Sequence, residues 1–212
     1  MIKHHLSEPL LLAYSAGTLP EAFNLVVAAH IDMCDQCRAD LAGFDAVGGA
    51  MLETETVDVT ADSFAATMAL IDAAPQVQAA KPARAASVLP APLHDYIGGD
   101  LDQVKWKRVG GGVRQAILAT SKDASVRLLH IPAGAAVPDH GHRGTELTLV
   151  LQGAFKDEED RFARGDIEVA TEELTHTPVA EEGLDCICLA ATDAPLRFTG
   201  LLPRLAQPFF KI

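Results

Sequence analysis

Apolar residues in the first third of the chain follow the period of an α-helix. In residues 17–30 they recur at three- and four-residue steps, which predicts a helix with one face carrying Phe23, Val26, Val27 and His30. The same period indicates helices over 37–53 and 60–73, and the apolar stripe of 60–73 consists of Phe64, Met68 and Ile71. Such a stripe usually packs in a core. This short segment offers few elements to cover it, so the stripe is also a candidate contact with a partner protein.

Beyond about residue 93 the pattern changes to short apolar runs that are separated by Gly, Pro and Asp. Runs of this kind are typical of strands, and they occupy residues 113–120, 125–132, 146–153 and 184–192. Several short strands in succession predict an all-β sandwich or barrel. The chain is therefore expected to be an α+β protein with an N-terminal helical bundle and a C-terminal all-β domain.

The segment between these two patterns reads as a linker. Residues 75–92 hold no acidic residue but carry Pro75, Pro82, Pro90 and Pro92, a composition typical of an extended, mobile connection. We therefore predict two domains, 1–74 and 93–212, that are joined by this linker.

Charge narrows the classes of function. The chain has a formal net charge of -12, and in residues 1–74 two basic side chains stand against eleven acidic ones, a net charge of -9. Such a surface repels a phosphate backbone and attracts a basic protein surface, so we expect a protein partner and no direct contact with nucleic acid. No stretch resembles a signal peptide or reaches the length of a membrane span, so the cytoplasm is the expected compartment. There, four cysteines are more plausibly thiols or metal ligands than disulfides.

The stretch "HIDMCDQC" places His30, Cys34 and Cys37 in the spacing H-x3-C-x2-C. Closely spaced ligands of this kind converge on one tetrahedral zinc, and a continuing helix would put His30 and Cys34 on one face. The residues alone leave the fourth ligand open between His4 and His5, and buried or redox-active thiols are the alternative interpretation. A structural metal also suits a segment that is too small to be stable on its own core.

These residues, within "GTLPEAF…VAAHIDMCDQCRADL", resemble the zinc-binding anti-sigma domain. The resemblance implies a small helical bundle in which one Zn²⁺ is held by His5, His30, Cys34 and Cys37. It also implies a sigma factor of the extracytoplasmic-function type as partner, which the bundle keeps from RNA polymerase.

A second group of candidate ligands lies in "GAAVPDHGHRGTELTLVLQG", where the spacing is G-x5-H-x-H-x3-E-x6-G. Alternation along a strand would point His140 and His142 to one face, with Glu146 nearby. The stretch resembles the first cupin motif. The second motif would begin at Gly165, which puts His176 in register as the fourth ligand of a cupin barrel. Imidazole and carboxylate ligands suit several divalent ions, of which Zn²⁺ is favoured here.

Two further features have no assigned function from the sequence. Cys186 and Cys188 share a strand face and are either a redox pair near the metal or small buried hydrophobic residues. The run "KDEED" at 156–160 is expected to be a solvated hairpin tip.

Taken together, both halves resemble ChrR-type zinc-binding anti-sigma factors, which carry a C-terminal cupin-like domain. The resemblance implies a regulator and not an enzyme: an anti-sigma factor whose cupin-like domain is needed for release under singlet-oxygen or peroxide stress. The alternative is a metal-dependent cupin enzyme, a dioxygenase or isomerase, with the zinc bundle as an accessory module.

Overall fold

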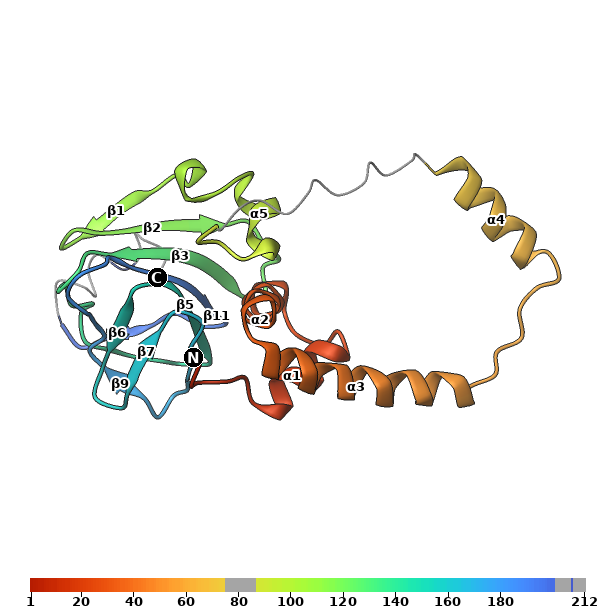
Figure 1. The fold of residues 1–212 in the computed structure, drawn as a ribbon, viewed down its shortest axis with the longest axis horizontal. Helices are drawn as coiled ribbons and strands as arrows, with labels where there is room; N and C mark the ends of the chain where they lie inside the picture. The colour runs from red at the N-terminus through yellow and green to blue at the C-terminus, as the bar shows by residue number, and fades with distance from the viewer. Residues whose placement is uncertain (75–86, 201–206, 208–212) are drawn as a thin grey trace.

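A computed structural model describes residues 1–74, 87–200 and 207 of the chain. Figure 1 shows helices at the N-terminal end and a β-domain formed by the rest. The helices are α1 (Glu8–Ser15), α2 (Glu21–Met33), α3 (Asp35–Thr54), α4 (Ser63–Ala73) and α5 (Ala91–Ile97), followed by a 3-10 turn, η1 (Leu101–Gln103). The three helices expected from the apolar period are present as α2, α3 and α4, whereas α1 and α5 were not predicted.

The strands of the β-domain pair antiparallel in three sheets within the described residues. The largest has the order β1-β2-β3-β11-β5-β8 and consists of β1 (Lys107–Gly110), β2 (Val113–Leu118), β3 (Ser125–Ile131), β11 (Cys186–Thr192), β5 (Glu146–Gln152) and β8 (Ile167–Ala170). The second has the order β10-β6-β7 and consists of β10 (Val179–Ala180), β6 (Ala154–Lys156) and β7 (Arg161–Ala163). The third has the order β12-β4-β9 and consists of β12 (Arg197–Phe198), β4 (His140–Gly141) and β9 (Thr175–His176). The four predicted strand runs are confirmed as β2, β3, β5 and β11.

The central strands of the large sheet, β11 and β5, are buried on both faces, which explains why they lack a simple apolar and polar alternation. On β11, Ile187, Leu189 and Ala191 belong to the core on the helical side. The alternate residues Cys186 and Cys188 belong to a smaller core inside the β-domain. Because successive side chains of a strand point to opposite faces, one strand serves both cores.

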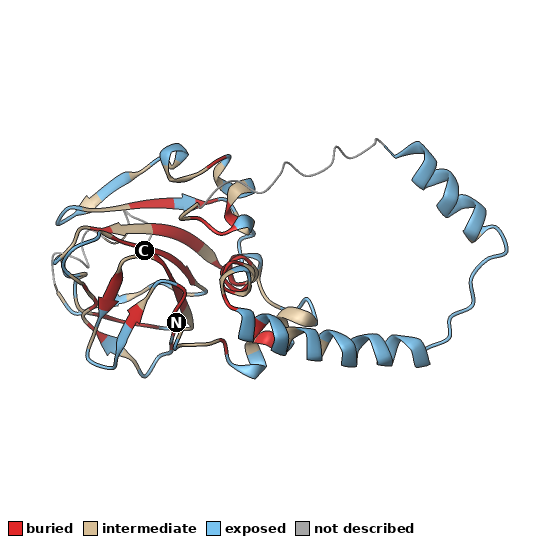
Figure 2. Cartoon of the chain, in the orientation of Figure 1, coloured by how far each residue is buried: buried red, intermediate tan, exposed pale blue. Residues whose placement is uncertain are grey.

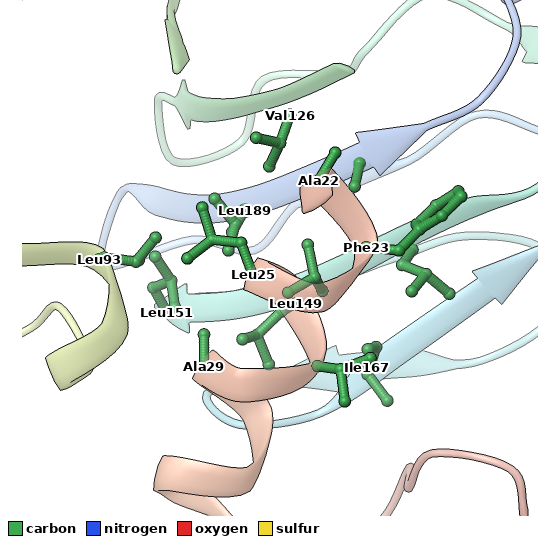
Figure 3. Close-up of a cluster of buried hydrophobic side chains, with 14 of the residues drawn as sticks. Ala22, Phe23, Leu25, Ala29, Leu93, Val126, Leu149, Leu151, Ile167 and Leu189 are labelled. Carbon is green, nitrogen blue, oxygen red and sulfur yellow. The ribbon is translucent and has the colours of Figure 1, made fainter. Parts of the chain in front are cut away.

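Helix α2 joins the helical segment to the sheet. Leu25 and Val26 are buried in a core that also contains Leu149 and Leu189 of the sheet, and Figure 3 shows α2 lying across these strands. Leu93 of α5 is buried in the same core. The two predicted domains therefore share one hydrophobic core.

The linker predicted for 75–92 lies mainly outside the described residues, because the structure describes only 87–92 of it. Within that part Leu89 is buried in the shared core, and α5 begins at Ala91. The chain is thus already packed before residue 93. In the described residues, no helix is both long and apolar enough to span a membrane.

Helix α4 stands apart from the remainder of the molecule in Figure 1, and none of its residues is buried. Figure 2 shows that α4 and the distal part of α3 are exposed along their length. The predicted apolar stripe is confirmed as helical, but its side chains face solvent: Phe64 is 77%, Met68 40% and Ile71 60% exposed. An apolar helix without a covering element is unusual in an isolated chain.

Candidate metal centres

The H-x3-C-x2-C segment forms a helix–turn–helix junction. His30 lies in the last turn of α2, which ends at Met33, and Cys34 has extended backbone angles with φ -118° and ψ 106°. The backbone N–H of Cys37 donates to Cys34 Sγ at 3.5 Å, so the thiol caps α3. The helix does not continue through Cys34, so His30 and Cys34 do not meet as two residues on one helix face. The break turns both sulfur atoms toward the end of α2.

The structure brings His5, His30, Cys34 and Cys37 together, with one potential ligand atom from each within 4.8 Å of all the others. His30 Nε2 lies 3.3 Å from Cys37 Sγ, and His5 Nδ1 lies 3.3 Å from Cys34 Sγ and 3.7 Å from Cys37 Sγ. In a tetrahedral zinc site a nitrogen and a sulfur ligand are about 3.6 Å apart. Of the two histidines that the sequence left open, His5 joins this cluster, whereas the His4 ring contacts Asp160.

Burial disfavours the charged forms of the cysteine and histidine side chains in this cluster, and a bound cation would offset this effect for the thiolates. Burial raises the pKa of the Cys37 thiol to about 11. Burial, together with the charge of His5, lowers the pKa of His30 to about 4, so this imidazole is neutral and able to act as a ligand. A bound divalent cation would stabilise the thiolate form. The donor set and its geometry therefore fit a metal.

The second cluster consists of His140, His142 and His176, which are all buried and whose donor atoms lie within 4.8 Å of one another. His140 and His176 are directly opposite in the pairing of β4 with β9, and His142 follows β4 immediately. Nε2 of His142 lies 3.4 Å from Nε2 of His176. Two nitrogen ligands of one tetrahedral zinc are about 3.3 Å apart.

Hydrogen bonds at the opposite ring nitrogens orient two of these imidazoles. His140 Nδ1 lies 2.9 Å from the carbonyl oxygen of Pro138, and His176 Nδ1 lies 2.7 Å from Asp157 Oδ2 and 3.3 Å from Glu168 Oε1. In each case the Nδ1–H can donate to oxygen, which leaves the lone pair of Nε2 to face a metal. This arrangement is typical of metal-binding histidines.

The pKa values of these histidines differ because their neighbours differ. Burial lowers the pKa of His140 and of His142 to about 4. Burial also lowers the pKa of His176, but the hydrogen bonds and charges of Glu168 and Asp157 outweigh it and raise the value to about 9. Burial raises the pKa of Glu168 to about 7. A cation at Nε2 of His176 would take the place of the proton that this ring otherwise binds.

Glu146, which was predicted as a ligand together with these histidines, is not part of the three-histidine cluster. It lines the same cavity as His140 and His176, but one of its carboxylate oxygens accepts a hydrogen bond from Thr148 Oγ1 at 3.2 Å. Burial raises its pKa. Its role as a ligand stays a prediction.

The cavity beside this cluster has a volume of about 530 Å³ and mainly apolar walls, which include Leu129, Phe155 and Phe198. Cys188 lines it, and Cys186 Sγ lies 3.5 Å from Cys188 Sγ. Both thiols are free and buried. The structure thus places the pair at the wall of the cavity that His140 and His176 also line.

Sequence reasoning missed Asp157 and Glu168. Asp157 was expected at a solvated hairpin tip, but its side chain is fully buried against His176. On β8, Glu168 is buried while the neighbouring Val169 is 40% exposed, the reverse of the order that hydrophobicity alone favours. Correct assignment of the strand's two faces could have identified Glu168 as an inward-facing carboxylate.

Comparison with known proteins gives consistent matches for this chain. Residues 95–194 match the family model described as the ChrR cupin-like domain. The chain is 62% identical over 213 residues to the anti-sigma-E factor ChrR of Cereibacter sphaeroides, covering 100% of this chain and 99% of that protein. It is also similar to the crystal structure of Rhodobacter sphaeroides SigE in complex with the anti-sigma ChrR, with a TM-score of 0.81 and 58% identity. That match covers 91% of this chain and 100% of the other.

Proposed function

This chain belongs to the ChrR family of anti-sigma factors, and we propose that it binds a sigma factor of the extracytoplasmic-function type and keeps it from RNA polymerase. The helices and the cupin-like β-domain of this family are both present. The chain is accordingly a regulator and not an enzyme. Its partner is a protein, and we propose that the two meet in the cytoplasm, where a sigma factor encounters RNA polymerase.

The observation that carries this proposal is the exposed apolar surface of α4. Among the described residues, no other element covers the large apolar side chains of α4. These side chains are Phe64, Met68, Leu70 and Ile71. The distal part of α3 also exposes apolar side chains, namely Val47, Met51 and Leu52, each more than 60% exposed. Burial of this much apolar surface is strongly favourable, and a helix face of this kind suits a groove on a partner. The net charge of -9 on residues 1–74 further favours a basic partner.

We propose that His5, His30, Cys34 and Cys37 hold Zn²⁺. Such an ion would cross-link the start of the chain to the α2–α3 junction, and this link would fix the direction in which α3 leaves the shared core. The geometry of the four donor atoms and their burial support this assignment.

For the cupin-like domain we propose a second divalent metal, Zn²⁺ as the favoured ion, on His140, His142 and His176, with Glu146 as the fourth candidate. We further propose that this domain is required for release of the sigma factor under singlet-oxygen or peroxide stress. Support comes from the position of the site beside a cavity that also contains Cys188. A ligand or oxidant can shift binding only through a site whose free energy differs between the bound and released states.

The test uses the full chain with a candidate sigma factor from the same genome. We expect the two proteins to co-purify, and we expect sigma-dependent transcription in vitro to fall when the chain is added before RNA polymerase. Transcription by a different sigma factor serves as the control and should not change. Undiminished transcription at a saturating concentration of the metal-loaded chain would refute sequestration.

A further inference from the structure

The residues before α1 form a strap, residues 1–6, that lies along the β-domain. Asp166 Oδ1 accepts hydrogen bonds from the backbone N–H of Lys3 at 2.6 Å and of His4 at 3.0 Å. In return, the carbonyl of His4 accepts from the N–H of Ile167 at 3.3 Å. The peptide units directly before His5 are therefore held by the β7–β8 turn. Figure 1 shows the N-terminus beside β7.

Side chains of the strap strengthen this attachment. The His4 ring lies 3.0 Å from Asp160 Oδ2 through Nε2, and its centroid is 4.4 Å from that of Phe162. Ile2 packs so closely on Gly165 that an added Cβ on this glycine, whose φ is +90°, would lie 2.6 Å from Ile2 Cδ1. Side chains and backbone of the strap are thus both docked on the segment from β7 to β8.

The strap leads directly into the candidate zinc site. His5 supplies a nitrogen to the cluster, since its Nδ1 lies 3.3 Å from Cys34 Sγ and 3.7 Å from Cys37 Sγ. Displacement of the strap would therefore move one potential ligand away from both thiols.

The same part of the β-domain contacts the histidine cluster. Asp157 binds His176 through Oδ2, and its Oδ1 accepts the N–H groups of Glu159 and Asp160 at 3.0 Å each. Glu168, two residues after Asp166, also approaches His176 Nδ1. Two short segments therefore reach from His176 to the strap: one runs from Asp157 to Asp160, and the other runs from Asp166 to Glu168.

We propose that these four side chains, the carboxylate bridge of Asp157, Asp160, Asp166 and Glu168, couple the two metal centres. A metal on His176 restrains this ring, and the restrained ring holds Asp157 and Glu168. Their segments hold the strap, and with it the position of His5. Loss of the metal from the histidine cluster removes the first restraint and weakens binding at His5, His30, Cys34 and Cys37. By linkage, a metal bound by His5, His30, Cys34 and Cys37 strengthens metal binding at the histidine cluster by the same factor.

This inference rests on the proposed function only in that both clusters bind metal. The metal coupling is tested separately from sigma-factor binding by measuring metal affinity in the full chain without a sigma factor. Co²⁺ is the probe, because a thiolate-to-cobalt absorption band reports the cysteine site and does not arise from imidazole ligands. Competition with a chelator then gives the affinity of the N-terminal site alone.

The first comparison is between the wild type and His140→Ala, a change outside the carboxylate bridge. We expect the variant to bind one metal equivalent less and its cysteine-site affinity for Co²⁺ to fall about fivefold or more, the lower end of common coupling between sites. An affinity equal to that of the wild type would overturn the coupling while leaving the zinc site intact. A wild type without the thiolate band would refute the zinc site, and the coupling with it.

The second comparison asks whether the carboxylate bridge carries the effect. Asp160→Ala removes an exposed partner of His4 Nε2 at 3.0 Å, and Asp185→Ala is the matched control because Asp185 pairs with His130 Nε2 at 3.1 Å elsewhere in the β-domain. We expect the loss caused by His140→Ala to be smaller in the Asp160→Ala background and unchanged in the Asp185→Ala background. When both Asp160→Ala and Asp166→Ala are present in the background, the loss of Co²⁺ affinity caused by His140→Ala should fall below about twofold. Equal losses in the Asp160→Ala and Asp185→Ala backgrounds would overturn the role of the bridge.

Discussion

Substitution of Leu70 by alanine tests the proposed partner surface directly. The side chain is 73% exposed on α4, and alanine retains high helix propensity, so the free chain should lose almost no stability. Leu→Ala removes groups worth about 2.4 kcal/mol on full burial, at about 0.8 kcal/mol per CH₂. Only the 73% of the side chain that is exposed in the free chain can be newly buried on binding. The expected loss of binding free energy is therefore about 1.8 kcal/mol, or about 20-fold in Kd.

The matched control is Leu184→Ala, since Leu184 is 67% exposed but precedes β11 in the β-domain. Titration calorimetry with the sigma factor should show the full loss of affinity for Leu70→Ala and a change within about twofold for Leu184→Ala. Thermal unfolding of both free variants should match the wild type. Equal affinities of the two variants for the sigma factor would show that α4 does not form the contact and would refute this reasoning.

Three further predictions concern the metals and the shared core. Cys34→Ser or Cys37→Ser should remove one zinc equivalent and sigma binding, as followed by metal analysis and co-purification; a variant that inhibits fully without zinc would contradict this. At saturating zinc, His140→Ala should keep sigma binding but lose induction of a sigma-dependent reporter by singlet oxygen, and normal induction would argue against the sensor role. Leu25→Ala, at a side chain only 4% exposed between α2 and the sheet, should cost about 2–5 kcal/mol in urea unfolding. Leu12→Ala, at a 53% exposed position, should change stability by less than about 0.5 kcal/mol, and equal losses would refute the packing argument.

Several elements could be predicted because their signals are local. Helical period identified α2 and α3, and the apolar run at 184–192 identified β11. In contrast, α1 is only eight residues long and begins with Glu-Pro, and β4 and β9 contain two residues each. Segments this short show too few periods for a reliable pattern, and pairing with distant neighbours decides their conformation.

The candidate ligands were also accessible from sequence, since metal sites use few residue types at narrow spacings. The residues that orient the ligands were not. Asp157 lies 19 residues before His176 in the chain, and nothing in the acidic run around it distinguishes the one buried carboxylate. The cost of burying Asp157 is offset by hydrogen bonds from His176 and from backbone N–H groups. Those bonds exist only once the β-domain has folded.

By itself, the sequence determined which of the longer helices and strands form, which faces of those helices are apolar, and which side chains are chemically able to hold metals, because these properties depend on neighbours within a few residues. Tertiary structure decided what each apolar face contacts. The face of α2 around Leu25 is covered by the sheet, whereas the equally apolar face of α4 around Leu70 has no cover within the described residues. It also decided that the strap before α1 docks on the β7–β8 turn. Both outcomes depend on contacts between residues far apart in the chain, whose free energy the local pattern does not contain.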